Sequence, residues 1–341
     1  MRWASRIPGA RIFWLMRAGI AVAAFLVLIA LAAAAPPGHA VRIGVLSLVA
    51  PNFDPATNPF ARELAEGLRE LGYTLGRDVS FEFRSANGDV TALPKIAAEL
   101  VDLKVDMLLT PMTNNTLAAA KATNSIPIVM VGATDPVDTG IVASLARPGG
   151  NVTGLAVNAA EIAAKRVQLL KEAVPNLSRV AVLWNASLRS MTLAFQNIEQ
   201  ASPRLGVTLQ SVRVTGSDEF DRAFAAIESS RPDGLIVLFG PLRGTDLPRI
   251  VEFAASRQIP TIFEPGEGIR GGGLIEFGAK ISPMFRRAAV YIDKIANGAN
   301  PADLPVEEPT QFDLAINLKA AKSMGIEVPY SLLLRADRVV E

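Results

Sequence analysis

Polar residues that could bind a small charged molecule follow the strands predicted from this sequence, at the points where those strands end. They are Ser47, Thr110, Thr113, Asp135, Asn185, Gly240 and Glu264. Carboxylates suit a ligand ammonium group, whereas hydroxyls, amides and the N–H groups at helix N-termini suit a carboxylate. Any one such residue is more often a helix cap or a turn residue than a ligand contact. Together, at the predicted edge where the strands end, they indicate a binding site for a small solute.

The most informative stretch runs over residues 126–158. Residues 126–131 are apolar and rich in β-branched side chains, which is typical of a buried parallel strand. A polar loop follows, residues 139–145 give one helical period, and residues 152–157 begin a second strand. This order places the segment after the first strand at the carboxyl edge of a parallel sheet, where open α/β folds bind ligands.

Asp135 lies in that segment, directly before Pro136. One interpretation is that its carboxylate faces a cleft between two lobes, with the chain crossing into the second lobe just beyond Val157. The other is that Asp135 is an ordinary turn residue before a proline. The sequence leaves both interpretations open.

Strands and helices alternate with short connections along the chain, and the alternation starts again after Val157. Two such runs with one junction predict an α/β fold of two doubly wound, parallel-sheet lobes. Residues 284–296 form a predicted helix, and residues 300–309 form a proline-rich connection. This additional helix and connection fit a chain that crosses back between the two lobes. Several such crossings would form a hinge with a defined direction of motion.

The composition removes the central residue of most hydrolase sites. Cysteine is absent, which removes disulfides, thiolate metal sites and thiol nucleophiles. The single histidine, His39, lies in the N-terminal segment, so the rest of the chain has no imidazole for zinc binding or general base catalysis. We expect no catalytic residues, no metal and no cofactor.

One glycine pattern leaves an enzyme alternative open. Gly266, Gly268 and Gly271 have the G-x-G-x-x-G spacing of dinucleotide sites. That fingerprint needs a strand before it and a helix after it, yet here it leads into a predicted strand at residues 274–277. A flexible loop at the lip of a cleft is therefore favoured over a Rossmann-type nucleotide-dependent oxidoreductase.

The N-terminal segment, residues 1–40, has the pattern of a secretory signal peptide. Four arginines precede an apolar run over residues 18–35, and small residues follow it. We expect cleavage between Ala35 and Ala40 and a periplasmic product; an uncleaved membrane anchor is the alternative. Removing these residues leaves 30 basic and 33 acidic side chains, a net charge of −3, which argues against nucleic acid as a partner.

Several phrases of the sequence resemble a known family. They are ARPGGNVTGL at residues 146–155, GGLIEFG at 272–278, the long run 286–326 and LLLRAD at 332–337. They are similar to the periplasmic substrate-binding proteins of ABC transporters, in the tryptophan and tyrosine importer type. The resemblance covers essentially the whole chain after the leader.

This resemblance implies a type I periplasmic-binding fold with three crossings between lobes. The first lobe would hold residues 41–157 plus 279–304, and the second would hold 158–278 plus 305–341. It also implies capture of a small molecule, an amino acid or an aromatic or organic acid, by a monomer that delivers it to an ABC permease in the inner membrane. A sensory binding module that reports to a receptor is a further alternative.

By the same resemblance, the ligand-contacting loops fall on the segments that the strand ends select, and Asn114, Gly132 and Phe239 join the candidates. The sequence departs from the family pattern in two places. Phe277 stands where many relatives carry tyrosine, and Met112 with Asn114 and Asn115 replaces smaller residues. The ligand therefore does not transfer from the family to this chain.

Overall fold

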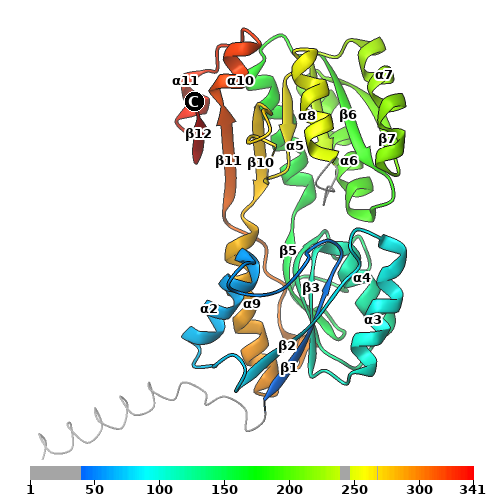
Figure 1. The fold of residues 1–341 in the computed structure, drawn as a ribbon, viewed down its shortest axis with the longest axis vertical. Coiled ribbons are helices and arrows are strands. Elements are labelled where there is room, and N and C mark those ends of the chain that lie inside the picture. Colours follow the sequence, from blue (N-terminus) through cyan, green and yellow to red (C-terminus); the bar gives the residue numbers. More distant parts are fainter. Residues whose placement is uncertain (1–39, 239–245, 267) are drawn as a thin grey trace, which may run out of the picture.

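A computed structural model describes residues 40–238, 246–266 and 268–341. It contains a five-stranded sheet and a seven-stranded sheet, each in its own α/β lobe, one above the other in Figure 1. The two-lobe expectation is confirmed. Within the described residues, no helix combines the length and the hydropathy that crossing a bilayer requires.

The first sheet is parallel throughout and has the strand order β2-β1-β3-β4-β5. Its strands are β1 (Val41–Ser47), β2 (Val79–Ser85), β3 (Met107–Pro111), β4 (Ile128–Thr134) and β5 (Val152–Val157). Successive side chains of a strand point to opposite faces, and both faces of this sheet are buried. In β4, Val129 joins one core cluster and Met130 joins the other. Burial on both sides explains why the start of β4 is a continuous apolar run.

Four helices and one 3₁₀ turn cover the first sheet. They are α2 (Pro59–Glu70), η1 (Val90–Ala92), α3 (Leu93–Asp102), α4 (Met112–Ala122) and α9 (Ile281–Ala296). Helix α9 comes from far along the chain and lies beside α2 (Figure 1). Gly67 makes this approach possible, because a Cβ atom there would lie 2.6 Å from the carbonyl oxygen of Arg286 on α9.

The second sheet has the order β12-β11-β10-β9-β8-β6-β7. Its strands are β6 (Arg179–Asn185), β7 (Thr208–Val214), β8 (Gly234–Leu238), β9 (Thr261–Phe263), β10 (Ile275–Ala279), β11 (Phe312–Asn317) and β12 (Arg338–Val340). The expected all-parallel arrangement needs one correction, because β10 and β11 pair antiparallel. The chain leaves this sheet after β10 and re-enters it at β11 from the side of the first lobe, so the returning strand runs the opposite way.

The helices of the second lobe follow the same alternation. They are α5 (Ala159–Ala173), α6 (Arg189–Ala201), η2 (Ser202–Leu205), η3 (Ser217–Glu219), α7 (Phe220–Ser230), α8 (Asp246–Ser256), α10 (Leu318–Ser323) and α11 (Tyr330–Leu333).

Three segments connect the two sheets. The first leads from β5 into α5, the second from β10 into α9, and the third from η4 (Pro301–Asp303) to β11. The third segment runs along the free edge of β5, where the N–H of Glu307 donates to Gly154 O at 3.0 Å. Neighbouring connections of this kind allow a hinge motion between lobes.

One expected element is wrong. Residues 139–145 do not form a helix but continue a turn that starts after Asp135, and β4 reaches β5 without a helix between them. Gly140 has φ +73°, a conformation that an α-helix does not use. Pro148 follows soon after, so the single helical period has no room to extend.

Candidate functional site

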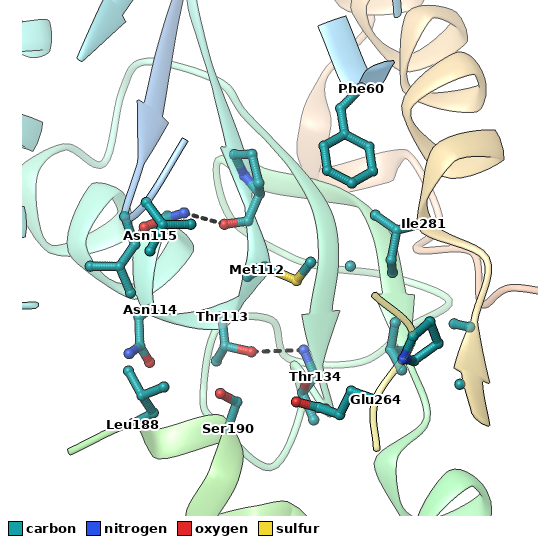
Figure 2. A pocket seen from close by; sticks show the side chains of 18 of the residues that line it. Phe60, Met112, Thr113, Asn114, Asn115, Thr134, Leu188, Ser190, Glu264 and Ile281 are labelled. Atoms are coloured by element: carbon teal, nitrogen blue, oxygen red, sulfur yellow. Dashed lines mark hydrogen bonds between the residues drawn. The ribbon is translucent and has the colours of Figure 1, made fainter. Parts of the chain in front are cut away.

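A cavity of about 350 Å³ lies between the two lobes, at the ends of the strands of the first sheet. Its wall combines β1, β4 and the start of α4 with α5, α6 and the segment after β9. Its volume falls in the range of small-molecule sites, about 300–1,000 Å³. Figure 2 shows a large part of its lining.

Half of the ten candidate residues line this cavity. They are Ser47, Thr113, Asn114, Gly132 and Glu264. Ser47 is the last residue of β1, and its hydroxyl oxygen accepts a hydrogen bond from Ala50 N at 2.9 Å. Thr113 lies in the first turn of α4, and its hydroxyl oxygen accepts from Thr134 N at 2.9 Å (Figure 2). This bond uses the Thr113 hydroxyl only as an acceptor, so its proton could be donated to a ligand.

The backbone at this edge adopts unusual conformations. Gly132 has φ +74° beside a register shift between Val131 and Ala133, and Met112 has φ +63° at the start of α4. A positive φ is strained for methionine and is held only where the surroundings fix it. Strain of this kind gathers at ligand-binding segments.

Three candidates do not line the cavity, and two lie outside the described residues. Thr110 is fully buried and shares a 2.9 Å hydrogen bond between its hydroxyl and that of Thr116. The side-chain oxygen of Asn185 accepts from both N and Oγ of Ser187, as in a turn. Phe239 and Gly240 belong to residues 239–245, which the structure does not describe.

Asp135 also lies off the cavity wall, where its carboxylate contacts the second lobe. One oxygen accepts from Ala159 N, the first residue of α5, at 3.0 Å, and the other accepts from Asn197 Nδ2 on α6 at 3.4 Å. Burial raises the pKa of this carboxyl, against the lowering effect of these two hydrogen bonds. Asp135 has φ +42°, so it occupies a turn conformation and also links the lobes.

Arg166 was not among the candidates, although it contributes a buried positive charge to the cavity wall. Its Nε donates to Phe277 O at 3.0 Å, and its Nη2 pairs with Glu264 Oε1 at 3.4 Å. Burial lowers the pKa of Arg166, and the charge of Glu264 raises it. An arginine stays protonated under such conditions, so a charged pair lies at the wall of the site.

A signal for Arg166 was present in the sequence. On α5, the positions three and four residues before and after it are apolar: Ile162, Ala163, Leu169 and Leu170. Residues at this spacing share one helix face. An arginine in the middle of an apolar face is either paired or placed at a site.

Most of the remaining lining is apolar and comes from both lobes. It includes Phe53, Phe60, Met112, Leu188, Met191, Ile281 and Phe285. The rings of Phe60 and Phe285 stack with centroids 5.0 Å apart. Phe60 keeps 36% of its surface exposed, although its helical spacing with Leu64, Leu68 and Leu71 predicts a core residue. These walls suit an apolar ligand portion beside the charged pair.

Three helices begin at the cavity without a side-chain cap. Helix α4 starts after Pro111, helix α6 after Leu188 and helix α9 after Lys280, and no side chain caps any of these starts. By contrast, Asn58 caps α2 and Asn158 caps α5. Uncapped first-turn N–H groups attract anionic ligand groups, since the helix dipole is positive there.

The glycine pattern near residue 268 has a packing role. A Cβ atom at Gly268 would lie 2.6 Å from the Phe263 ring, and one at Gly273 would lie 2.5 Å from it. The segment leads into β10 and not into a helix, so it lacks the helix N-terminus that a dinucleotide pyrophosphate needs. Among the described residues, no group of three or more His, Cys, Asp or Glu side chains could hold a metal ion.

The profile of the ABC transporter substrate binding protein family matches residues 43–340. The chain belongs to this family. Its members are substrate-binding components of ABC transporters, so the family resemblance in the sequence is confirmed. The two-lobed α/β fold and the solute-binding function expected from it are confirmed with it.

Characterised relatives share most of the length of this substrate-binding protein. A tyrosine-binding protein of Clostridioides difficile (strain R20291) is 26% identical over 291 residues, which cover 84% of this chain and 81% of the relative. An ABC domain from Streptococcus pneumonia, solved in complex with L-Trp, is 26% identical with a TM-score of 0.79, covering 88% of this chain and all of that one. A leucine-binding protein from Thermotoga maritima shares the fold at 19% identity, with a TM-score of 0.51 and coverage of 77% and 78%.

Proposed function

We propose that this substrate-binding protein captures a free α-amino acid with an apolar, ring-bearing side chain. The observation that carries the proposal is the Arg166–Glu264 pair at the wall of an otherwise largely apolar cavity. An amino acid has an ammonium group and a carboxylate on neighbouring atoms. The pair offers one complementary charge for each of them.

The geometry of the pair leaves room for a ligand. Arg166 is fixed by its bond to Phe277 O, and its contact to Glu264 is long for a charge-assisted hydrogen bond. A ligand carboxylate could bind the guanidinium with help from the Thr113 and Ser190 hydroxyls, and a ligand ammonium could bind Glu264. Hydrogen bonds to charged groups contribute about 1.5–3 kcal/mol each, so two or three of them support micromolar binding.

The apolar lining and the relatives support a ring on the ligand. Phe60, Met112 and Met191 offer flat or adaptable contact surfaces. Two of the relatives named above, each 26% identical, are a tyrosine-binding protein and an ABC domain solved in complex with L-Trp. Among the original candidates, we keep Ser47, Thr113, Asn114, Gly132 and Glu264 as ligand contacts.

Capture by hinge closure follows from this arrangement. The ligand would bind one lobe first, and contacts from the other lobe would stabilise the closed form. In that reading, residues 41–157 and 279–304 move as one lobe, and residues 158–278 and 305–341 move as the other. Asp135 then acts as a contact between lobes in the closed form.

The cellular role also belongs to the proposal. The leader at residues 1–40 would direct the chain to the periplasm, where a monomer without enzymatic activity hands its ligand to an inner-membrane ABC permease. The arginines before an apolar run and the family membership support this role.

Calorimetric titration of the purified chain with L-phenylalanine, L-tyrosine and L-tryptophan tests the ligand class. We expect micromolar or tighter binding of at least one of them, and at least tenfold weaker binding by Glu264→Gln. The matched control is Glu228→Gln, which removes an exposed ion pair with Arg257 outside the cavity lining. Absence of binding for all three amino acids, or equal affinity of Glu264→Gln and wild type, would overturn the proposal.

A further inference from the structure

Asn115 is a buried amide at the cavity that none of the contacts described so far uses. It lies in the first turn of α4, is 3% exposed and forms part of the cavity lining. Its neighbour Asn114 is more exposed, and the nearby hydroxyls of Thr110 and Thr116 bond to each other. Asn115 therefore supplies a polar group that this part of the wall does not otherwise offer.

The hydrogen bonds fix which way the Asn115 amide points. Its Nδ2 donates to the carbonyl oxygen of Pro111 (Figure 2). Turning the amide over would place its own oxygen against the Pro111 oxygen, so that two acceptors would face each other. The nitrogen thus stays on Pro111, and the oxygen stays free of it.

That oxygen has no partner. Across the described parts of the chain, Asn115 Oδ1 is the one buried side-chain nitrogen or oxygen without a hydrogen bond. A buried acceptor left unpaired destabilises the protein and is rare in native structures. An unpaired acceptor at a ligand cavity is explained if the ligand supplies the donor.

We propose that Asn115 Oδ1 accepts a hydrogen bond from an N–H or O–H group on the ligand's side chain and so determines specificity. This inference rests on the proposed function. Figure 2 shows Asn115 and Glu264 on opposite sides of the cavity. A ligand whose ammonium group lies at Glu264 would extend its side chain across the cavity toward Asn115.

The groups on the two sides of the cavity, Glu264 and Asn115, define the ligand class. The ligand is an aromatic amino acid with a donor on its ring, such as a phenol or an indole, and not a plain hydrocarbon ring. A site built to bond a donor discriminates strongly against an analogue without it, because the buried acceptor is then left unpaired.

The test uses ligand pairs that differ only in the donor. L-Tryptophan is compared with 3-(3-benzothienyl)-L-alanine, in which sulfur replaces the ring N–H, and L-tyrosine is compared with L-phenylalanine. In calorimetric titrations of the wild-type chain, we expect the donor-bearing member of at least one pair to bind at least about tenfold more tightly.

The variant Asn115→Leu tests whether Asn115 is the acceptor. It has nearly the same shape and lacks the oxygen, so the preference within the pair should fall to about twofold or less. Asn115→Ala serves the same purpose if the leucine variant does not fold, and the thermal melting of each variant without ligand controls for folding.

The outcomes separate the two proposals. Equal affinity within both pairs overturns the role of Asn115, while tight binding of all members leaves the proposed amino-acid function intact. An unchanged preference in a folded Asn115 variant overturns the role as well. No binding of any of these amino acids overturns the proposed function and this inference together.

Discussion

The carboxylate of Asp135 accepts a hydrogen bond from the side-chain amide of Asn197, with 3.4 Å between Oδ2 and Nδ2. The two residues belong to different lobes, since Asp135 follows β4 and Asn197 lies on α6. The second carboxylate oxygen bonds to Ala159 N at the start of α5. Asp135 therefore holds two elements of the second lobe against the edge of the first sheet, beside the cavity.

Removing the Asn197 amide should weaken ligand binding without touching the cavity wall. Under the proposed hinge closure, this hydrogen bond to a charged group forms as the lobes approach, and its free energy then adds to the apparent affinity. We expect Asn197→Ala to bind the best ligand of the amino-acid panel about threefold to tenfold more weakly, measured by calorimetry. Gln196→Ala, an exposed change on the same helix, is the control. Equal affinities of wild type and Asn197→Ala would contradict the closure role.

Asp135 should also make stability depend on pH. Burial raises its pKa in the folded chain above the ordinary aspartate value of 3.8. The stability that this group contributes is then complete below pH 3.8 and is lost as the pH rises through the raised folded pKa. We expect the free energy of unfolding of wild type, relative to Asp135→Asn, to fall as the pH rises over this window. Urea unfolding from pH 3.5 to pH 7 measures this difference, and a difference that rises with pH would contradict the assignment.

The sheets and several rim residues were predictable because both depend on the local order of strands. The run from Ile128 to Val131 is buried on both faces, and burial on both faces produces the continuous apolar pattern. Ser47 is the last residue of β1 and Glu264 directly follows β9, so the ends of those strands place both residues at the cavity.

Other features depend on tertiary contacts. The apolar face around Arg166 indicates that this residue is buried, but its partners, Phe277 O and Glu264, come from segments far along the chain. Phe60 has the spacing of a core residue, yet a hollow between the lobes leaves its ring at the cavity. The antiparallel direction of β11 depends on the path of the returning chain, which the apolar pattern of the strand does not encode.

Gly154 should be essential for the pairing of β4 and β5. Its φ is +128°, and a Cβ atom there would lie 2.2 Å from the carbonyl oxygen of Met130. Strain and overpacking together predict that Gly154→Ala lowers the free energy of unfolding by about 2–4 kcal/mol. Gly150→Ala is the matched control, because nothing lies within 4 Å of a Cβ atom at that position. Urea unfolding compares the two variants, and equal stabilities would refute the prediction.

Arg338 should stabilise β12 through its ion pair with the buried carboxylate of Glu276. Its Nη2 pairs with Glu276 Oε2 at 3.1 Å and with Asp313 Oδ2 at 3.0 Å, and the Glu276 side chain is only 1% exposed. Arg338→Met would leave the Glu276 carboxylate with a bond to Ile269 N but without its cation. Because Arg338 itself is 43% exposed, we expect a loss of about 1–3 kcal/mol, below that of a fully buried pair. Faster hydrogen exchange in β12 should accompany this loss, since β12 pairs only with β11 within the described sheet.

The control variant Arg222→Met, which breaks an exposed pair with Glu219, should lower the free energy of unfolding by less than about 1 kcal/mol. If urea unfolding gives the same change for both arginine variants, the buried acid does not anchor the strand.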